Sequence, residues 1–544
     1  MARTIASIDL RMDDLERLVD RTRHAPLTDD EHATLKAAIH TLGYVAQLLD
    51  QKGATLAGLR HLLLGTQTEK PHDVLARAGV AADAPATPTE TAPDTSAEAR
   101  HTARRRGHGR HAAAAYGGAE HVVVPHAQLH HGDRCPLCIT GTVYAQRDPG
   151  VLIRLKGQPP INGTVYELEK FRCHLCGEVF TADPPAGVGP EKYDATTGAM
   201  IALLKYGSGM PFHRLERLQA HLEIPLPAST QWEIVDDLAT RIRPILTELI
   251  RQAANGEVVH NDDTSMTVLA LERPGAPRGD PDDVSPERTG IFTSGIVATR
   301  DGRRVALFVT GRRHAGENLA RVLAERTADR GPPIQMCDAL SRNLPKPLAV
   351  IVGHCLAHAR RHVVEVASSF PAECRRILET LGAVYRYDAE ARAQALSADA
   401  RLAYHQTHSG PVLEDLHGWL TAQLADHLVE PNSSLGQAIT HLLKHWTPLT
   451  LFLRQAGAPL DNNIVERSLK KAILHRKNAL FYKTPTGACV GDLFMSLIHT
   501  CELEGVNPFQ YLTALQRHGD GLATDPVAWL PWNYQDALAA TASA

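Results

Sequence analysis

The stretch from residue 256 to residue 271 carries the most informative hydrophobic pattern of the chain. Apolar residues crowd both sides of an acidic pair, Asp262 and Asp263. This pattern predicts a buried strand that ends at the carboxylates and is followed by a second apolar run. A carboxylate at the end of a buried strand is costly unless it is paired, hydrogen-bonded or bound to a metal. Asp262 is therefore a candidate metal ligand, and its partners must lie elsewhere in the chain.

A regular order of strands and helices follows this acidic strand. The pattern predicts, in chain order, a strand at 290–300, a strand at 303–310, a helix at 316–328 and a strand at 332–338. Asp301 and Gly302 form the turn between the first two of these strands. The last strand ends in a lone carboxylate, Asp338. This order is expected of a ribonuclease H-like core, which brings its first and fourth strands together at the centre of the sheet.

Helical patterns precede the acidic strand and follow the core. Residues 193–250 predict helices, and 212–221 with the segment after it resemble a helix-turn-helix in which Ser229 or Thr230 is the N-cap. Ordinary helical packing is the alternative, because the second helix carries acidic residues near its start. At the other end of the chain, the segment after Asp525 is expected to be peripheral.

A further helix opens near Asp461, after a mostly helical stretch at 357–455, and it carries Glu466. Glu466 has capping-box spacing to Asn463 and ion-pair spacing to Lys470, so a purely structural role is an alternative for it. The basic residues that accompany this helix are Lys470, Lys471, Arg476 and Lys477. They are candidates for contacts with DNA phosphates, with plain surface solvation as the alternative.

The N-terminal part of the chain has a helical stretch, a linker and a basic segment. Leucine recurs at every seventh position, at Leu35, Leu42, Leu49, Leu56 and Leu63. This spacing predicts either a coiled-coil seam or a helix that folds back on its own domain. Residues 80–102 have the composition of a disordered linker. The basic segment that follows contains Arg104, Arg105, Arg106 and Arg110, which either grip phosphates or belong to a solvated linker.

Two C-x-x-C pairs lie between the basic segment and the first predicted helices. They are Cys135 with Cys138 and Cys173 with Cys176. Four thiolates can close a tetrahedron around Zn²⁺, and such a site is structural because no position remains open for water. A ribbon without metal is the alternative, since the interval between the pairs is longer than usual.

Composition and charge limit the remaining classes of protein. A chain of 544 residues is long enough for several domains. Its net charge of -4 excludes a uniformly basic nucleic-acid binder, so contact with DNA requires local basic patches. No apolar run approaches a membrane span, and no signal-peptide core follows Met1. These features, with paired cysteines typical of a reducing compartment, predict a cytoplasmic protein without a membrane partner.

The three acids Asp262, Asp338 and Glu466 fit the chemistry of a metal-dependent site. Three carboxylates are costly together unless divalent cations neutralise them, and oxygen ligands suit Mg²⁺ or Mn²⁺. Two such ions roughly 3.5–4 Å apart activate the attacking oxygen and stabilise the leaving oxygen of a phosphodiester displacement. Asp263 is the alternative to Asp262, because strand alternation sends neighbouring side chains to opposite faces.

Over nearly its whole length the chain resembles the TnpC-type transposases of the insertion sequence sixty-six family. The matching residues are Leu64-Gly65, Thr68-Glu69-Lys70, Gly107-His108-Gly109-Arg110, the cysteines from Cys135 to Cys176, Leu204 to Pro211, His260 to Thr264, Cys355 to Arg361, Asp461 to Glu466, Arg476-Lys477-Asn478 and Gly505 to Pro508. Such ordered agreement is more specific than any single motif.

The resemblance implies roles for particular residues. It implies that Asp262, Asp338 and Glu466 are the three catalytic acids, although Asp263 stands where glutamate is more usual. It also implies zinc at the four cysteines, recognition of transposon ends by the N-terminal half, and a helical insertion at about 366–456 before the last catalytic helix. His354, His358 and His362 are spaced to share a helix face, but the Cys355 to His358 motif is interpreted as support for the core rather than as a metal site.

Together with this resemblance, the sequence predicts a multidomain α/β DNA transposase with a ribonuclease H-like mixed-sheet core. The expected organisation is a zipper-like helix at 28–70, a linker with the basic segment at 71–115, a zinc-binding domain at 120–185, a helical DNA-binding region at 190–252, a catalytic domain at 255–515 and a C-terminal tail at 516–544. The expected partners are double-stranded DNA, further copies of the chain and accessory proteins of the same element, with nucleoid association when DNA is bound. An inactive DNA-binding relative and a nuclease without strand transfer are the alternative functions.

Overall fold

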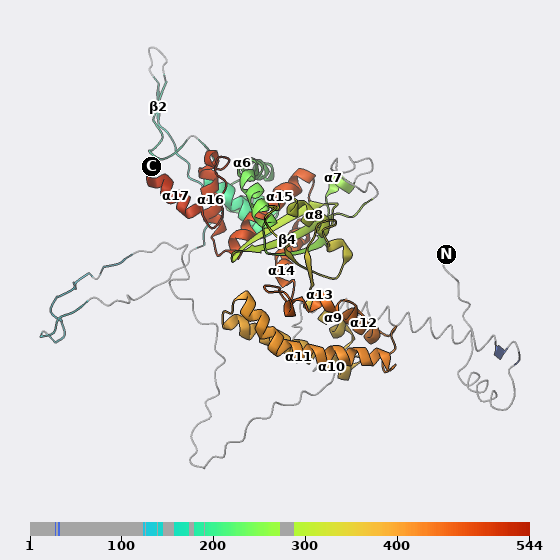
Figure 1. Ribbon diagram of the computed structural model, residues 1–544. Helices are drawn as coiled ribbons and strands as arrows, with labels where there is room; N and C mark the ends of the chain where they lie inside the picture. The colour runs from blue at the N-terminus through green and yellow to red at the C-terminus, as the bar shows by residue number, and fades with distance from the viewer. Residues whose placement is uncertain are drawn as a thin grey trace. The chain divides into compact units, whose positions relative to one another are not determined.

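The structure is a computed structural model (Figure 1). It describes residues 28, 31–32, 123–125, 127–138, 140–144, 157–172, 179–189, 191–272 and 288–543. The basic segment and nearly all of the zipper-like helix predicted at 28–70 lie outside the described residues. The described part of the chain forms two compact units. One is helical and includes Arg360–Ala393 and His408–Thr440. The other contains the sheet and includes the described residues between 123 and 359, Gln394–Thr407 and the described residues from His441 onward.

A five-stranded mixed sheet forms the centre of the sheet-containing unit. Its strands are β3 (Val258–Ser265), β4 (Phe292–Arg300), β5 (Arg303–Gly311), β6 (Ile334–Cys337) and β7 (Ile351–His354). The order across the sheet is β5-β4-β3-β6-β7. Strands β3, β4 and β5 pair antiparallel, whereas β6 pairs parallel with both β3 and β7. The mixed α/β class is confirmed, and the strand order is compatible with a ribonuclease H-like core.

The register of β3 determines where the acidic residues lie. Asp262 is opposite Gly295 of β4, and Val258 pairs with Ile334 of β6. Because β3 and β6 run parallel, the residues that follow their last parallel pairs lie at the same edge of the sheet. The prediction that β3 ends at the carboxylates is wrong, because the strand continues to Ser265 as the antiparallel partner of β4. Asp262 and Asp263 therefore follow the last residue of β3 that pairs with β6, but they are still paired with β4.

The hairpin between β4 and β5 has the predicted turn. Asp301 and Gly302 have φ angles of 49° and 76°. Positive φ at both central residues is typical of a type I′ turn, whose twist matches that of the flanking strands. The strong turn signal in the sequence is thus the reason that both strand boundaries were predicted closely.

Helices cover the sheet and complete the core of this unit (Figure 1). They are α4 (Ala195–Ala202), the π-helix η2 (Leu203–Gly207), α5 (Phe212–His221), α6 (Ala228–Ala254), α7 (Leu269–Glu272), α8 (Ala315–Leu323), α13 (Trp446–Leu449), α14 (Asn463–Ala479), α15 (Pro485–Leu503), α16 (Pro508–Arg517) and α17 (Tyr534–Ser543), with short 3-10 turns η3 (Ser341–Asn343), η4 (Leu451–Leu453) and η5 (Gly519–Gly521). A separate pair, β1 (Lys170–Arg172) and β2 (Val179–Thr181), forms a two-stranded antiparallel ribbon. Among the described residues, no helix is long and apolar enough to span a bilayer.

Helix α6 shows why the segment before the sheet packs into the core. Its fully buried positions include Leu238, Ile242, Ile245 and Leu249, which recur at helical spacing. The prediction of Ser229 or Thr230 as N-cap is wrong, because the helix begins at Ala228 after Pro227 and has no side-chain cap. Pro227 itself occupies the N-cap position, with φ and ψ of -58° and 146°.

Helix α15 protects the edge of the sheet. Asp492, Ser496 and Thr500 recur every fourth residue, and their side chains accept hydrogen bonds from the backbone N–H groups of β5 at 2.6, 2.9 and 3.0 Å. The outer N–H groups of an edge strand need partners when they are buried. Strand β5 thus obtains its outer partners from helical side chains.

The C-terminal segment is part of the core. Trp529, Leu530 and Tyr534 are buried, and the Tyr511 hydroxyl donates a 2.8 Å hydrogen bond to the Trp529 carbonyl. The prediction that the segment after Asp525 is peripheral is therefore wrong. The segment has few apolar residues at periodic spacing, so its sequence pattern did not indicate that Trp529, Leu530 and Tyr534 pack against α16 and the neighbouring core.

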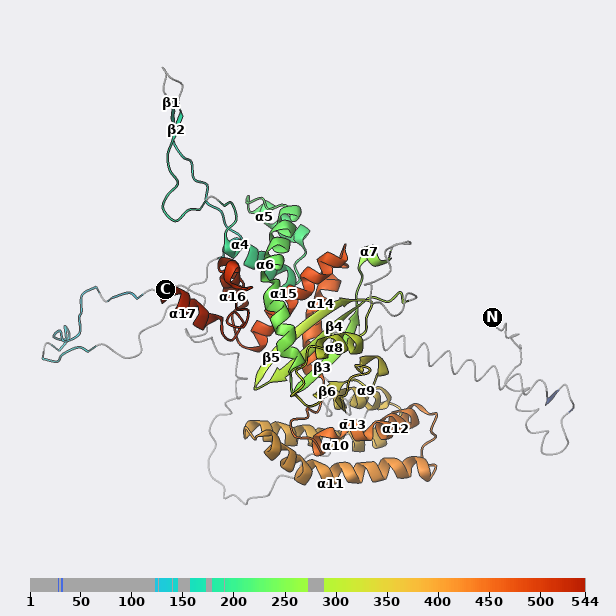
Figure 2. The same ribbon diagram turned by 45° about the horizontal axis from the view of Figure 1, so that its top comes forward.

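The helical unit corresponds to the helical region predicted before the Glu466 helix. It includes α10 (Pro371–Ala393) and most of α11 (Ala398–Ala425) and α12 (Ser434–Lys444), while α9 (Leu356–Val366) leads into it from β7. Arg376 forms a 2.9 Å ion pair with Asp415, and its guanidinium lies 4.9 Å from the centre of the Trp419 ring. Helices α10 and α11 thus lie side by side (Figure 2), and the region is helical as predicted.

Candidate active site

Asp262 lies half-buried on β3, within reach of the charges of the other two predicted acids. The main cause that raises the pKa of its carboxyl to about 7 is burial. The negative charges of Asp338, Asp263 and Glu466 act in the same direction, whereas the hydrogen bond from the Asp263 N–H opposes them. The structure therefore places Asp338, after β6, and Glu466, in the first turn of α14, close enough to Asp262 for their charges to act on its carboxyl.

Asp338 follows β6 directly and is held by the turn after it. Its Oδ1 atom accepts hydrogen bonds from the Leu340 N–H at 3.1 Å and from the Asn343 side chain. The parallel pairing of β3 and β6 places this residue at the same sheet edge as Asp262. Two parallel strands that are far apart in the sequence, β3 and β6, thus contribute one aspartate each.

The neighbouring aspartate, Asp263, has different partners. Its side chain is only 2% exposed, and its two oxygens lie 3.3 Å from the Arg342 guanidinium and 3.0 Å from His314 Nδ1. The Ala315 N–H at the start of α8 is also within 3.5 Å. Asp263 thus secures α8 and the η3 turn, and because successive strand residues point to opposite faces, the Asp262 side chain leaves the strand on the other face.

Asn462 fixes the start of the helix that carries Glu466. It is fully buried, its Nδ2 donates to the Asn261 carbonyl at 3.1 Å, and its Oδ1 lies 3.1 Å from His260 Nδ1. Its own N–H donates to the Cys355 sulfur at 3.2 Å. The alternative of a capping box between Asn463 and Glu466 is wrong, because Asn463 is the first residue inside α14 and Asn462 occupies the N-cap position.

A network of buried side-chain amides lies beneath the acids. Asn261 Nδ2 donates to the Asn343 carbonyl at 2.8 Å, and Gln335 Nε2 donates to both Asn261 Oδ1 and the Asn343 carbonyl at 2.7 Å. These bonds join β3, β6 and the η3 turn, so they fix the positions of Asp262 and Asp338 relative to each other. Sequence reasoning missed Gln335 and Asn343, although a polar residue within a short apolar strand is itself a signal.

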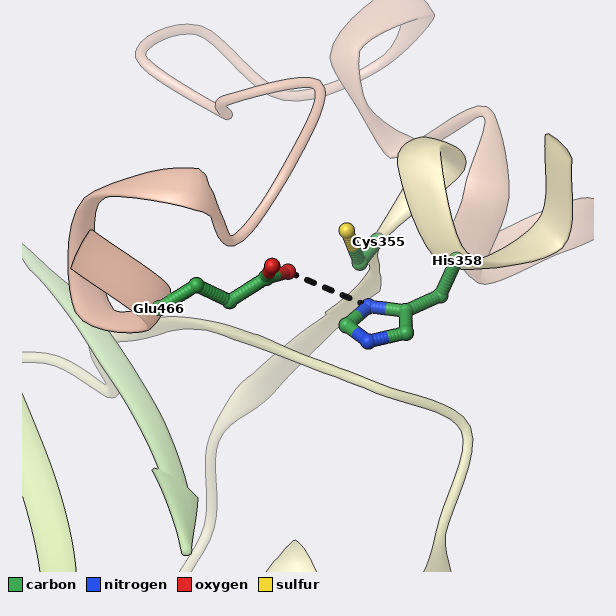
Figure 3. Close-up of side chains that lie close together, drawn as sticks. All are labelled: Cys355, His358 and Glu466. Carbon is green, nitrogen blue, oxygen red and sulfur yellow. Dashed lines mark ion pairs between the residues drawn. The ribbon is translucent and has the colours of Figure 1, made fainter. Parts of the chain in front are cut away.

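Cys355 and His358 lie beside Glu466 (Figure 3). One atom of each residue, the sulfur, a ring nitrogen and a carboxylate oxygen, falls within a group whose members are all within 4.8 Å of one another. The prediction that His354, His358 and His362 share a helix face is wrong, because His354 ends β7 and α9 begins at Leu356. Spacing alone does not distinguish one helix from a strand that turns into a helix.

The basic residues of α14 divide into two groups. Lys470 and Lys477 are exposed. Lys471 forms a 2.8 Å ion pair with Glu502, and the Arg476 guanidinium donates to Thr264 Oγ1 at 3.2 Å and to Ser265 Oγ at 2.6 Å. Arg476 therefore anchors the end of β3, whereas Lys470 and Lys477 remain on the surface. The predicted Arg104, Arg105, Arg106 and Arg110 lie outside the described residues.

Half of the predicted cysteine site is described. Cys135 and Cys138 lie in a turn in which the Cys135 N–H donates to the Gly141 carbonyl at 2.8 Å and the Gly141 N–H donates to the Cys138 sulfur at 3.3 Å. This hydrogen bond is the largest cause that lowers the pKa of the Cys138 thiol. Such a turn suits a thiolate ligand. Cys173 and Cys176 lie outside the described residues.

The acidic set has the chemistry of a divalent-cation site. A buried carboxyl whose pKa is raised toward neutrality by burial and by like charges is stabilised when a cation is bound. Asp262, Asp338 and Glu466 offer oxygen donors, which Mg²⁺ and Mn²⁺ prefer. The residues present therefore fit such an ion.

A mixed sheet with one carboxylate from within β3, one directly after β6 and one from the first turn of α14 defines an α/β protein with an acidic site beyond the parallel pairing of β3 and β6. A family model described as Transposase IS66 family matches residues 192–489, which include the whole of this site. Because the match covers more than half of the 544 residues, the chain belongs to this transposase family. The resemblance predicted from the sequence is confirmed.

Three proteins of Sinorhizobium fredii are similar to this chain. Uncharacterized protein y4hP is 28% identical over 401 residues, which are 69% of this chain and 68% of the relative. Uncharacterized protein y4qI is 25% identical over 356 residues, or 62% of each chain. Uncharacterized protein y4jD is 36% identical over 185 residues, or 33% of this chain and 35% of the relative. The chain thus matches less than two thirds of the length of the last two.

Proposed function

We propose that this chain is a DNA transposase that hydrolyses a phosphodiester bond at the ends of its element and joins the released 3′-OH to target DNA. The proposal takes the sheet as a ribonuclease H-like core and Asp262, Asp338 and Glu466 as its catalytic acids. The observation that supports it most strongly is that the half-buried Asp262 carboxyl lies within reach of the negative charges of Asp338 and Glu466, which add to the effect of burial in raising its pKa. Membership of a transposase family supports the same reaction class.

Each acid has a defined place in the proposed reaction. Asp262, Asp338 and Glu466 would hold two divalent cations, which when bound supply an activated attacking oxygen and charge stabilisation at the leaving oxygen. The amide network of Asn261 and Gln335 keeps the aspartates in position without carrying charge. Asn462 does the same for the first turn of α14.

The proposal also assigns DNA contacts and a structural metal. Lys470 and Lys477 project from the helix that carries Glu466, where they would hold phosphates close to the acids. Lys471 and Arg476 would hold this part of α14 in place, because Lys471 is paired with Glu502 and Arg476 donates to Ser265 at the end of β3. The segment with Arg104, Arg105, Arg106 and Arg110 would add phosphate contacts, and Cys135, Cys138, Cys173 and Cys176 would hold one structural Zn²⁺.

The proposed reaction involves more than one DNA molecule and more than one copy of the chain. Two element ends and a target must be brought together, so we propose a homo-oligomer on double-stranded DNA, with accessory proteins of the same element as further partners. Association with the nucleoid would follow from DNA binding.

The test is a cleavage and joining assay on linear duplexes in which an inverted repeat of the element is followed by flanking DNA, so that the bond to be cut is present. With Mg²⁺ or Mn²⁺, the wild-type chain should nick the 3′ end and transfer it to a second duplex. The single variants Asp262→Ala, Asp338→Ala and Glu466→Ala should each lose both steps while they still retard the DNA on a gel. Asp301→Asn in the exposed β-turn is the matched control and should keep full activity.

Each other outcome identifies one of the alternatives. Cleavage without any transfer of the 3′ end would indicate a nuclease. DNA retardation by the wild type without cleavage would indicate an inactive DNA-binding relative. Retained cleavage in any one of the three acid variants would remove that residue from the catalytic set.

A further inference from the structure

Three donor side chains of different chemistry converge next to the acidic site. Cys355 lies at the junction of β7 and α9, His358 in the first turn of α9, and Glu466 in the first turn of α14. Their donor atoms lie within 4.8 Å of one another, and all three side chains point toward the same space (Figure 3). Cys355 and His358 are neighbours at the start of α9, whereas Glu466 comes from α14, so the fold brings the third donor to a local pair.

The contact between His358 and Glu466 fits a shared ion better than a direct bond. His358 Nδ1 lies 3.4 Å from Glu466 Oε1, which is close enough for an ion pair. The same nitrogen is nevertheless buried without a hydrogen-bond partner, because its geometry toward the carboxylate is not that of a hydrogen bond. Two ligands bound to Zn²⁺ at about 2.0–2.1 Å in a tetrahedron lie about 3.3–3.4 Å apart. The observed separation therefore matches an edge of that tetrahedron.

The Cys355 sulfur is buried and held by backbone donors. Its residue is 1% exposed, and the sulfur accepts hydrogen bonds from the backbone N–H groups of Asn462, at 3.2 Å, and of His358. The Cys355 N–H is itself fixed by the Cys337 carbonyl at 2.8 Å. Backbone donors around a ligand sulfur hold its position and stabilise its charge. Asn462 thus orients both the sulfur and the helix that carries Glu466.

We propose that Cys355, His358 and Glu466 bind one Zn²⁺ ion, in a site separate from the Cys135 to Cys176 region. A thiolate, an imidazole and a carboxylate are a donor set that Zn²⁺ accepts and that Mg²⁺ does not prefer. Three protein ligands leave the fourth position open. The ion would tie the first turn of α14 to the start of α9 and so restrict where the Glu466 carboxylate lies.

The zinc site goes beyond the proposed function and shares only Glu466 with it. The carboxylate has two oxygens, and Oε1 is the one that faces His358. Zinc on this oxygen leaves the other one for the ion held by the aspartates. Zinc binding does not require that the chain cut DNA, so the two proposals can be tested independently.

The test counts zinc in the full-length chain. The protein is freed of metal, equilibrated with Zn²⁺ and desalted, and zinc per chain is measured by mass spectrometry. Cys355→Ser and His358→Gln should each retain one ion fewer per chain than the wild type. Cys374→Ser is the matched control, because Cys374 is equally buried but lies in α10; it should retain the wild-type count. Cys135→Ser combined with Cys355→Ser should lose the ions of both sites.

Co²⁺ in place of Zn²⁺ provides a second measurement. The charge-transfer absorption of a Co²⁺ thiolate should decrease in Cys355→Ser and remain in Cys374→Ser. If Cys355→Ser does not fold, His358→Gln decides the matter, since the His358 side chain is 28% exposed and tolerates the change. Equal zinc counts and equal Co²⁺ spectra in the wild type and both variants would overturn the proposal. Asp262→Asn should keep the zinc and lose DNA cleavage, which separates failure of this site from failure of the proposed reaction.

Discussion

His260 Nδ1 lies 3.1 Å from Asn462 Oδ1, although 202 residues separate them in the sequence. Burial lowers the pKa of His260 to about 4, and the hydrogen bond to Asn462 opposes that shift only in part. The imidazole is therefore neutral at physiological pH and donates its Nδ1 proton to the amide oxygen. Since the Asn462 amide nitrogen donates to Asn261, the side chain has a partner on both ends. This pairing connects the strand of Asp262 to the helix of Glu466.

Replacing Asn462 with alanine tests this connection. Asn462→Ala leaves the Asn261 carbonyl and His260 without their partner, which costs about 1–3 kcal/mol of unfolding free energy. The start of α14 is then free to shift, and a displacement of about 1 Å can reduce a rate about a hundredfold. We expect DNA cleavage to fall by that order, while the melting temperature falls by a few degrees.

The control for this change is Asn432→Ala, which removes the same amide from an exposed position in the helical unit. It should leave both cleavage and melting temperature unchanged. An Asn462→Ala variant with wild-type cleavage would show that the pairing does not position Glu466.

Gly295 tests the packing of the Glu466 helix on the sheet. Gly295 is the strand partner of Asp262, and a Cβ atom there would lie 3.0 Å from Leu469 Cγ and 3.2 Å from Val465 Cγ2. Both contacts are with buried side chains of α14. Gly295→Ala should therefore displace the helix at a cost of about 1–3 kcal/mol and reduce cleavage. Gly311→Ala on β5 is the control, because its Cβ would meet no atom within 4 Å. Equal unfolding midpoints for the two variants would contradict the packing argument.

The strands and the two aspartates were predictable because their signals are local. Alternation, the Asp301 and Gly302 turn and a short apolar run before Asp338 are all contained within a few residues. Parallel or antiparallel pairing then follows from the fold class. Once the fold class is known, the order of the strands in the sheet and the end of the sheet at which Asp262 lies can therefore be predicted without knowing any individual long-range contact.

The surroundings of Glu466 were not predictable in the same way. The Asn462 N–H reaches the Cys355 sulfur across 107 residues, and no local pattern reports such a contact. Helical spacing of His354, His358 and His362 was misleading, because β7 ends at His354. The C-terminal segment was missed because burial of Trp529 depends on Tyr511, whose hydroxyl bonds to its carbonyl.

Substitution of the two neighbouring aspartates distinguishes their roles. Asp262→Asn removes a buried carboxylate that lies among like charges, so in the presence of a chelator it should raise the melting temperature while cleavage is lost. Asp263→Asn breaks contacts to Arg342 and His314, so it should lower the melting temperature and leave measurable cleavage. Thermal melts in chelator together with the cleavage assay separate the two. The opposite pattern would place the catalytic aspartate one residue later.

Binding of Mg²⁺ should depend on pH through the same carboxyl. The pKa of Asp262 is about 7 without metal, so below pH 7 a proton must leave before the cation binds. The apparent affinity should therefore fall by up to about tenfold for each pH unit below 7 and level off above it. Thermal shift at increasing Mg²⁺ between pH 6 and pH 8 measures this dependence. Asp262→Asn should lose it, and an affinity that is constant over this range in the wild type would refute the assignment.

A second buried carboxyl makes stability itself depend on pH. Asp492 accepts two hydrogen bonds of 2.6 Å from Thr310, yet burial raises its pKa to about 7. The pKa of the Asp492 carboxyl is therefore higher in the folded chain than in the unfolded chain. Its stabilising contribution to the free energy of unfolding is fully present below about pH 4 and is lost as pH rises through 7. Asp492→Asn removes the titrating group. The difference between the urea midpoints of Asp492→Asn and the wild type should therefore increase from pH 5 to pH 7. The increase corresponds to about 2 kcal/mol of unfolding free energy. Asp301→Asn should show no such trend. Parallel pH profiles for Asp492→Asn and the wild type would show that this carboxyl is charged throughout.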